Sequence, residues 1–499
     1  MPDLNEFIGY SHSLLIAPAG YGKTHTIAEC LNLVKGKHLV LTHTNAGIGS
    51  ILEKVKSLNV PTSNYQILTI SSLAQTLAIA YSKDLPVQEN NKEYYKAIII
   101  KATELIKTNA IAHMLQNSYS GLFVDEYQDC TISQHFFIQE LSTFFPTHLL
   151  GDPMQGIFNL DKSDPLVNFE DKVMMGNYLE HTYHLDKPWR WIKHNNLKLG
   201  EDLHNIRLAL ESTQTPLQDF SNYKSISFYQ FDKNELYSKP SESEFKRLIY
   251  QILNRNENVL FILSNSINRE SRLNIVKAFL GRIMMLESMD EKRFYSISRS
   301  IDSTVGKSII ANIHDLLIEL FPKTEIEKYI KNDHLIKPRN KKGENPNTRK
   351  SQTLKNLIEK FECTSNLLIL KDIIQLMSEI IGRQPIEKEI YFTIIRAIEN
   401  AYYNGTTVYD EIKNQRNISR RVGRRLYGKS IGTTLLTKGL ECDTAVLLDD
   451  SDYPFNYKNQ YVALTRGGKN VIVIKLIGKP KVEAKKPRST NENQLSLWN

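Results

Sequence analysis

The stretch APAGYGKT occupies residues 17–24, between the apolar run SLLIA (13–17), whose last residue it shares, and a helix predicted from Thr24. Its glycines let backbone N–H groups turn toward an anion, and the N-terminus of the helix adds partial positive charge. Lys23 would reach the β- and γ-phosphates of a nucleotide, and the Thr24 hydroxyl would ligate Mg²⁺. A chance turn is the alternative, and Ala17 stands where the usual pattern has glycine, but the strand–loop–helix context favours a phosphate-binding loop. The residues expected to contact the nucleotide here are Ala17, Pro18, Ala19, Gly20, Tyr21, Gly22, Lys23 and Thr24.

A second motif supplies the acids that a nucleotide site needs. The run LFVDE at residues 122–126 predicts a strand that ends in two carboxylates. Asp125 would hold Mg²⁺, and Glu126 would orient or deprotonate the attacking water. Acids after an apolar run are common by themselves, so the pair carries weight because Lys23 precedes it. Together the two motifs predict a nucleoside triphosphatase.

Strands and helices alternate around these motifs. Short apolar runs separated by helices imply a parallel sheet covered on both faces, so we expect an α/β protein. Mainly helical stretches at residues 75–117 and 272–415 break the alternation, which predicts two α/β domains, each with a helical insertion. The strands are expected at residues 13–17, 38–42, 67–70, 122–124, 148–150, 259–263, 433–436, 445–448 and 471–475.

Composition excludes some classes of protein. A hydrophobic content of 41% and a charged content of 24% are typical of globular proteins, and no apolar run approaches the length of a membrane span. The N-terminus does not resemble a signal peptide, so a cytoplasmic location is expected. The four cysteines are far apart in the sequence and are expected to be free thiols rather than metal ligands.

Positive charge is concentrated in two segments. The net charge of +8 suits a polyanionic partner only weakly, because many proteins without such a partner are basic. Residues 337–350 are basic but also rich in Gly, Pro and Asn, so a solvated loop is an equal alternative. Residues 420–429 lie next to a predicted strand, which favours contact with phosphates.

Further strings resemble, in the correct order, the motifs of UvrD-like superfamily-1 DNA helicases. Any one of them could arise by chance, but their order over residues 13–475 could hardly do so. Besides the phosphate loop, they are THTNA (42–46), TISSL (69–73), DEYQD (125–129), GDPMQGIF (151–158), LDKPWR (185–190), VLFILSNSINRESR (259–272), KGLE (438–441) and YVALTR (461–466).

The resemblance implies roles for single residues. Gln155 would sense the γ-phosphate, Trp189 would stack on adenine, and Arg190 would reach the γ-phosphate. Glu441 would bind the ribose, and Arg466 would stabilise charge in the transition state. ATP would then lie in a cleft between two domains. The residues implied to contact DNA are Thr42, Thr44, Asn45, Ser71 and Phe158.

The resemblance also implies two RecA-like P-loop domains. The first would comprise residues 1–77 and 118–184, with a short helical insertion at 78–117. The second would comprise residues 185–271 and 428–478, with a larger helical insertion at 272–427. Residues 479–499, which are rich in Lys and Pro and then polar, would form a flexible tail.

Three departures from the family pattern bear on how well the chain unwinds DNA. No glutamine precedes the phosphate loop, which puts adenine specificity in doubt. Leu160 replaces an aromatic residue, with Asp161 and Lys162 in place of the usual Arg-Gly, and a lost stacking platform costs about 1–3 kcal/mol per base. The first insertion is also shorter than is usual in processive relatives.

The compact size and the strings GDPMQGIF and PWRW resemble the helicase-like B subunit of Gabija anti-phage defence systems. This resemblance implies a partner ATPase–nuclease subunit and a substrate with DNA ends or gaps. No segment of the chain resembles a nuclease, and Asp449, Asp450 and Asp452 are expected to lie in a solvated loop, so cleavage would come from the partner.

The last residues, Gln494–Trp498, read QLSLW and resemble peptides that bind the bacterial sliding clamp. The alternative is that this segment docks on its own domain. Two classes of function therefore remain open for the chain. One is an ATP-dependent 3′-to-5′ translocase or helicase on single-stranded DNA, and the other is an ATP-operated sensor that regulates a nuclease and unwinds little.

Overall fold

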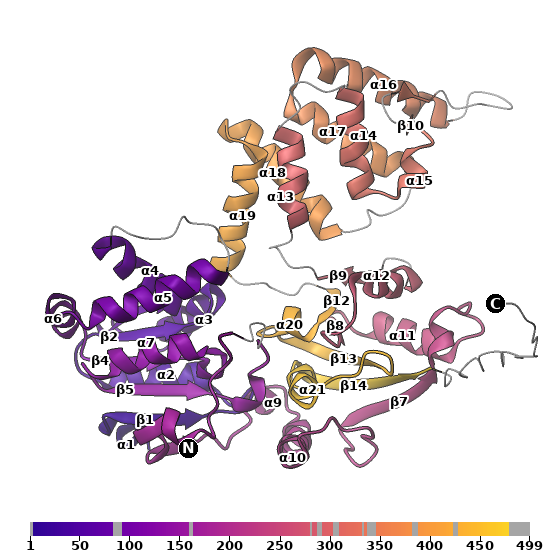
Figure 1. Ribbon diagram of the computed structural model, residues 1–499. Helices are drawn as coiled ribbons and strands as arrows, with labels where there is room; N and C mark the ends of the chain where they lie inside the picture. Colours follow the sequence, from indigo (N-terminus) through magenta and orange to yellow (C-terminus); the bar gives the residue numbers. More distant parts are fainter. Residues whose placement is uncertain are drawn as a thin grey trace, which may run out of the picture.

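The computed structural model describes residues 3–82, 92–158, 163–279, 282–286, 292–302, 309–331, 334–336, 346–381, 388–422 and 428–478. Within these residues, two six-stranded sheets and a block of helices form an α/β structure (Figure 1). The expectations for Leu160, Asp161 and Lys162, for the tail and for most of the two basic segments concern positions outside the described residues. None of the described helices is long and apolar enough to cross a membrane.

All strands of the first sheet are parallel, as the pattern predicts. Their order is β3-β2-β4-β5-β1-β6. Nearly every residue of the central strands is buried, which explains why they are continuous apolar runs. The strands are β1 (His12–Ile16), β2 (His38–Thr42), β3 (Tyr65–Thr69), β4 (Gly121–Val124), β5 (Thr147–Gly151) and β6 (Thr182–His184).

Helices cover both faces of the first sheet. One face, with Leu15 and Val40, packs on α1 (Leu4–Gly9), α2 (Lys23–Leu33) and α3 (Asn45–Ser57). The other face, with Leu14 and Leu39, packs on α4 (Ile70–Tyr81), α5 (Lys92–Ile106), α6 (Asn109–Ser118) and α7 (Ile132–Ser142). Helices α5 and α6, which fall in the expected first insertion, thus share the core of this sheet.

The second sheet is also parallel, in the order β7-β14-β13-β8-β12-β9. Its strands are β7 (Ile226–Asp232), β8 (Val259–Leu263), β9 (Met284–Met285), β12 (Lys429–Thr433), β13 (Cys442–Asp450) and β14 (Gly467–Ile477). It packs on α10 (Leu197–Thr213) and α21 (Tyr457–Leu464) on one face and on α11 (Glu244–Arg255) and α12 (Arg269–Ala278) on the other.

The prediction of a strand at residues 433–436 is wrong. The strand β12 ends at Thr433, and the helix α20 (Thr434–Thr437) follows it. The sequence KSIGT of β12 contains Lys and Gly, which are poor strand formers, but pairing with β8 and β9 fixes it as a buried strand. The strands β6 and β7 are not among the predicted ones.

The block of helices has a core of its own, formed by residues between Ile297 and Ile412. The chain leaves the second sheet after β9 and returns at β12, and these two strands pair. Figure 1 shows the block beside the two sheets, with α19 reaching α3 of the first sheet. Its elements are α13 (Lys292–Asp302), α14 (Ile309–Leu320), α15 (Lys323–Ile326), β10 (Ile330–Lys331), β11 (His334–Leu335), α16 (Pro346–Thr364), α17 (Leu367–Ile381), α18 (Lys388–Asn404) and α19 (Val408–Val422).

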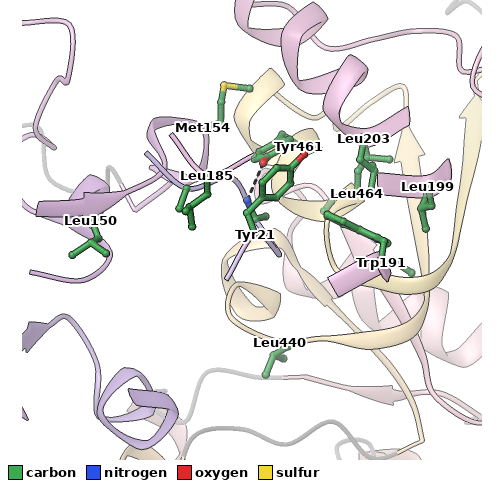
Figure 2. Packing of buried hydrophobic residues seen from close by; sticks show 14 of the residues in the cluster. Tyr21, Leu150, Met154, Leu185, Trp191, Leu199, Leu203, Leu440, Tyr461 and Leu464 are labelled. Atoms are coloured by element: carbon green, nitrogen blue, oxygen red, sulfur yellow. Dashed lines mark hydrogen bonds between the residues drawn. The ribbon is translucent and has the colours of Figure 1, made fainter. Parts of the chain in front are cut away.

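A single apolar cluster joins the two sheets. Its members come from the phosphate loop (Ala19, Tyr21), from the segment between the sheets (Trp191) and from α21 (Tyr461). Figure 2 shows Tyr21, Trp191 and Tyr461 gathered in this cluster. This cluster therefore holds the phosphate loop of the first sheet against the helix α21 of the second sheet.

Candidate nucleotide site

The predicted site residues gather at one edge of the first sheet. The phosphate loop follows β1, the acids Asp125 and Glu126 follow β4, and Gln155 follows β5. Because these strands are parallel and neighbouring, their carboxyl ends meet at the same edge. Open α/β sheets bind ligands at this edge.

The glycines of the phosphate loop are required by their backbone. Gly20 and Gly22 have φ values of +79° and +95°, in the left-handed region that favours glycine. A Cβ atom at Gly22 would lie 3.2 Å from Cδ1 of Trp189, and one at Gly20 would lie 3.0 Å from Cβ of Arg190. The segment Trp189–Arg190 therefore covers the loop directly.

Lys23, the first residue of α2, contacts both acids. Its Nζ atom lies 2.6 Å from Oε2 of Glu126 and 3.5 Å from Oδ1 of Asp125. Burial alone would lower the pKa of Lys23, but Glu126 and Asp125 outweigh it and raise the pKa. For Glu126 burial acts in the opposite direction and would raise the pKa, but Lys23 and Lys438 lower it to about 2. This carboxylate is therefore ionised at neutral pH.

Asp125 and Glu126 differ in environment. Burial raises the pKa of Asp125 to about 6, although Lys23 opposes the shift. Glu126 has φ of +55°, which is costly for a residue with a side chain, and its N–H donates to Oδ1 of Asp125 at 2.9 Å. Such backbone conformations cluster at functional sites.

The donor set suits Mg²⁺ better than a transition metal. Thr24 and Asp125 offer one hydroxyl and one carboxylate, and Mg²⁺ in nucleotide sites usually takes few protein ligands besides phosphate and water oxygens. No group of three His, Cys, Asp or Glu side chains that could hold a metal occurs among the described residues.

Two arginines reach this edge from outside the first sheet: Arg190 from the segment between the sheets and Arg466 from the residue before β14 in the second sheet. Arg466, which lies between α21 and β14, is 3% exposed and donates to Oε1 of Gln155 at 3.4 Å. It therefore joins the second sheet to the segment after β5. Burial lowers the pKa of Arg466 to about 10, and Arg190 beside it adds to the effect. Arg190 donates to the carbonyl oxygen of Thr465 at 2.5 Å and forms an ion pair with Glu441. Glu441 borders a cavity of about 230 Å³ that is also lined by His194, Asn258, Cys442, Asp443 and Gly468.

Two buried ion pairs in the site were not predicted from the sequence. Lys438 binds Asp129, and Arg207 of α10 binds Asp152 at 2.5 Å. Tyr461 is a further site residue that was not predicted, because its hydroxyl accepts the N–H of Ala19 in the phosphate loop at 3.1 Å (Figure 2). The KGLE string could have indicated a role for Lys438 in the site. Arg207 lies in an ordinary amphipathic helix, and no sequence pattern marks it as a site residue.

The residues expected to contact DNA lie at or after the carboxyl ends of β2, β3 and β5, along the same edge of the first sheet. Thr42 ends β2 and is buried, Thr44 caps α3 through the N–H of Gly47, and Asn45 begins that helix. Ser71 lies in the first turn of α4. Phe158 is half-buried and lies beneath Lys438, whose Nζ atom is 4.4 Å from the ring centroid.

Comparison with known proteins gives one family. Residues 75–172 match the model of the UvrD/REP helicase N-terminal domain. The matched segment includes Asp125, Glu126 and Gln155. No curated protein matches the chain. The match supports a UvrD-like helicase family for this chain, a family that implies ATP hydrolysis and binding to DNA.

Proposed function

We propose that the protein is a DNA-dependent ATPase of helicase build, with two RecA-like domains that bind ATP between them. The observation that carries this proposal is the contact of Arg466 with Gln155, which brings an arginine of the second sheet to the edge where Lys23 and Glu126 lie. An arginine supplied across a domain interface is worth about 10³–10⁵ in the rate of phosphoryl transfer.

Each residue has a distinct task in this proposal. Lys23 would leave Glu126 to bind the β- and γ-phosphates, which would free the Glu126 carboxylate to orient and deprotonate water. Thr24 and Asp125 would hold Mg²⁺, which supplies charge neutralisation on the phosphate oxygens. Arg190 leaves Glu441, so the arginine turns to the γ-phosphate and the glutamate to the ribose.

Opening and closing of the ATP-binding cleft between the two domains, driven by hydrolysis, would move the protein along single-stranded DNA in the 3′-to-5′ direction. The Thr44, Asn45 and Ser71 positions at the edge of the first sheet would contact the strand. We further propose a role in anti-phage defence with a nuclease partner, and binding of Gln494–Trp498 to a sliding clamp. A sensor that unwinds little is the second candidate, favoured by Leu160 in place of an aromatic residue.

ATP hydrolysis with and without single-stranded DNA tests the proposal. The wild type should hydrolyse ATP faster with DNA, and Lys23→Ala should reduce turnover to background. Glu126→Gln should retain ATP binding and lose turnover, while Lys35→Ala, an exposed lysine that follows α2, should match the wild type. DNA-stimulated turnover that survives Lys23→Ala would refute the site. Turnover without strand separation on a forked substrate would favour the sensor.

A further inference from the structure

Arg207 occupies an unusual position for an arginine. It lies within α10, is 6% exposed, and points into the contact between the two sheets. Its guanidinium donates to Oδ1 of Asp152 at 2.5 Å and to the hydroxyl of Tyr461 at 3.1 Å. Its other terminal nitrogen binds Glu211, one helical turn further along α10, at 2.8 Å. A buried, forked cation of this kind fixes the groups that it contacts.

Asp152 is the common partner in this arrangement. It is fully buried and accepts from the Nε2 amide of Gln155 at 2.8 Å, in addition to Arg207. The Tyr461 hydroxyl donates to Oδ2 of Asp152 at 3.3 Å, the oxygen that also accepts from Gln155. An ionised carboxylate in this position needs a cation, because a buried charge without a partner is strongly unfavourable.

The contacts of Asp152 lead to both halves of the site. Gln155 donates to Asp152 through Nε2 and accepts from Arg466 through Oε1, so its amide is held in one orientation. Tyr461 accepts the N–H of Ala19 and so ties the phosphate loop to α21. A displaced carboxylate would therefore release Gln155 and the Ala19 contact together.

We propose that Arg207 is a positioning residue for ATP hydrolysis, which holds Asp152 so that this carboxylate orients Gln155 and, through Tyr461, anchors the phosphate loop. The inference rests on the proposed function. A purely structural ion pair would affect folding alone, whereas a positioning residue affects turnover in molecules that are folded and bind ATP.

The test measures kcat and KM for ATP with single-stranded DNA, together with thermal unfolding, on the full chain. Arg207→Met should lower kcat by about 10- to 100-fold and change KM by less than about 3-fold, since small displacements of catalytic groups have effects of this size on rate. Arg207→Lys keeps the charge and should recover part of kcat. Tyr461→Phe removes only the hydroxyl and should lower kcat less than Arg207→Met does.

A double-variant cycle separates the two explanations. If Arg207 acts through Asp152, then Arg207→Met combined with Asp152→Asn should be no slower than Asp152→Asn alone. The control is Lys233→Met, which breaks a partly buried ion pair with Asp450 in the second sheet, 2.8 Å long, and should leave kcat unchanged. The inference would be overturned if the losses in kcat of the two single variants add up in the double variant. It would also be overturned if the loss in kcat of Arg207→Met is no larger than the fraction of that variant that is unfolded.

The wild type and Lys23→Ala distinguish failure of the inference from failure of the proposed function. If wild-type turnover is lost in Lys23→Ala but Arg207→Met matches the wild type, only the inference fails. If the wild type does not hydrolyse ATP, the proposed function fails and the inference fails with it.

Discussion

Lys438 joins the two sheets through Asp129. Its Nζ atom lies 2.5 and 2.6 Å from the two carboxylate oxygens of Asp129 and 2.6 Å from the carbonyl oxygen of Gln155. Both side chains are less than a tenth exposed. Burial raises the pKa of Asp129 to about 6 even though Lys438 opposes the shift. The pair therefore holds charge in a poorly solvated interface, where loss of one partner is costly.

Lys438→Met should weaken this interface. Removing one partner of a buried ion pair costs about 3–5 kcal/mol, because the other charge remains buried. We expect a lower midpoint of thermal unfolding and, in small-angle X-ray scattering, a larger radius of gyration. The control is Lys469→Met, which breaks an exposed pair with Asp443, 3.0 Å long, and should cost at most about 1 kcal/mol. Equal effects of the two variants would contradict the prediction.

Gly22→Ala should abolish ATP binding as well as strain the chain. A left-handed backbone costs a residue with a side chain about 1–2 kcal/mol. The new methyl group would also meet the Trp189 ring. Gly405→Ala provides the matched control, because Gly405 has φ of +64° and a Cβ atom there would have nothing within 4 Å. Both variants should lose stability, Gly22→Ala at least as much as Gly405→Ala, but only Gly22→Ala should lose binding of a fluorescent ATP analogue.

The two tryptophans of the segment between the sheets should differ in their effects. Trp191 is 1% exposed and donates to the carbonyl oxygen of Gly467 at 3.0 Å. Trp191→Ala should cost about 3–5 kcal/mol in the free energy of unfolding, measured with urea. Trp189 is half-buried over the phosphate loop, so Trp189→Ala should cost less stability and raise KM for ATP. The reverse order of the two effects would refute these assignments.

His148 should make the first sheet sensitive to acid. Its imidazole is buried and bonds the hydroxyl of Ser13 at 2.8 Å. Burial, with His38 and His12 adding to it, lowers the pKa of His148 to about 3. Because the folded pKa lies below the unfolded value, this contribution to stability is complete above about pH 6.5 and is lost as the pH falls toward 3.

The expected loss from His148 between pH 7 and pH 4 is about 3 kcal/mol in the free energy of unfolding. His148→Asn keeps a polar partner for Ser13 and removes the titration, so its stability should depend less on pH over this range. The exposed histidine variant His113→Asn should retain the wild-type dependence. A wild-type slope in His148→Asn would show that other groups cause the acid sensitivity.

Patterns within short segments carried most of what the sequence predicted. The buried strands β2, β4 and β8 are continuous apolar runs, and the phosphate loop contains its own turn signals. The strand β12 was misplaced because its sequence is a weak strand former and only pairing fixes it. Arg207 lies 55 residues from Asp152 along the chain, and no local pattern indicates a contact at that separation.

The chain enters and leaves the block of helices at neighbouring strands. Ile431 of β12 lies opposite Met285 of β9, so the two ends of the insertion are adjacent in the second sheet. The block also has its own core. Segments whose ends lie close together can be exchanged without disturbing their host. The helical block is thus a module that evolution could lengthen, replace or remove while the two sheets and the candidate nucleotide site stayed intact.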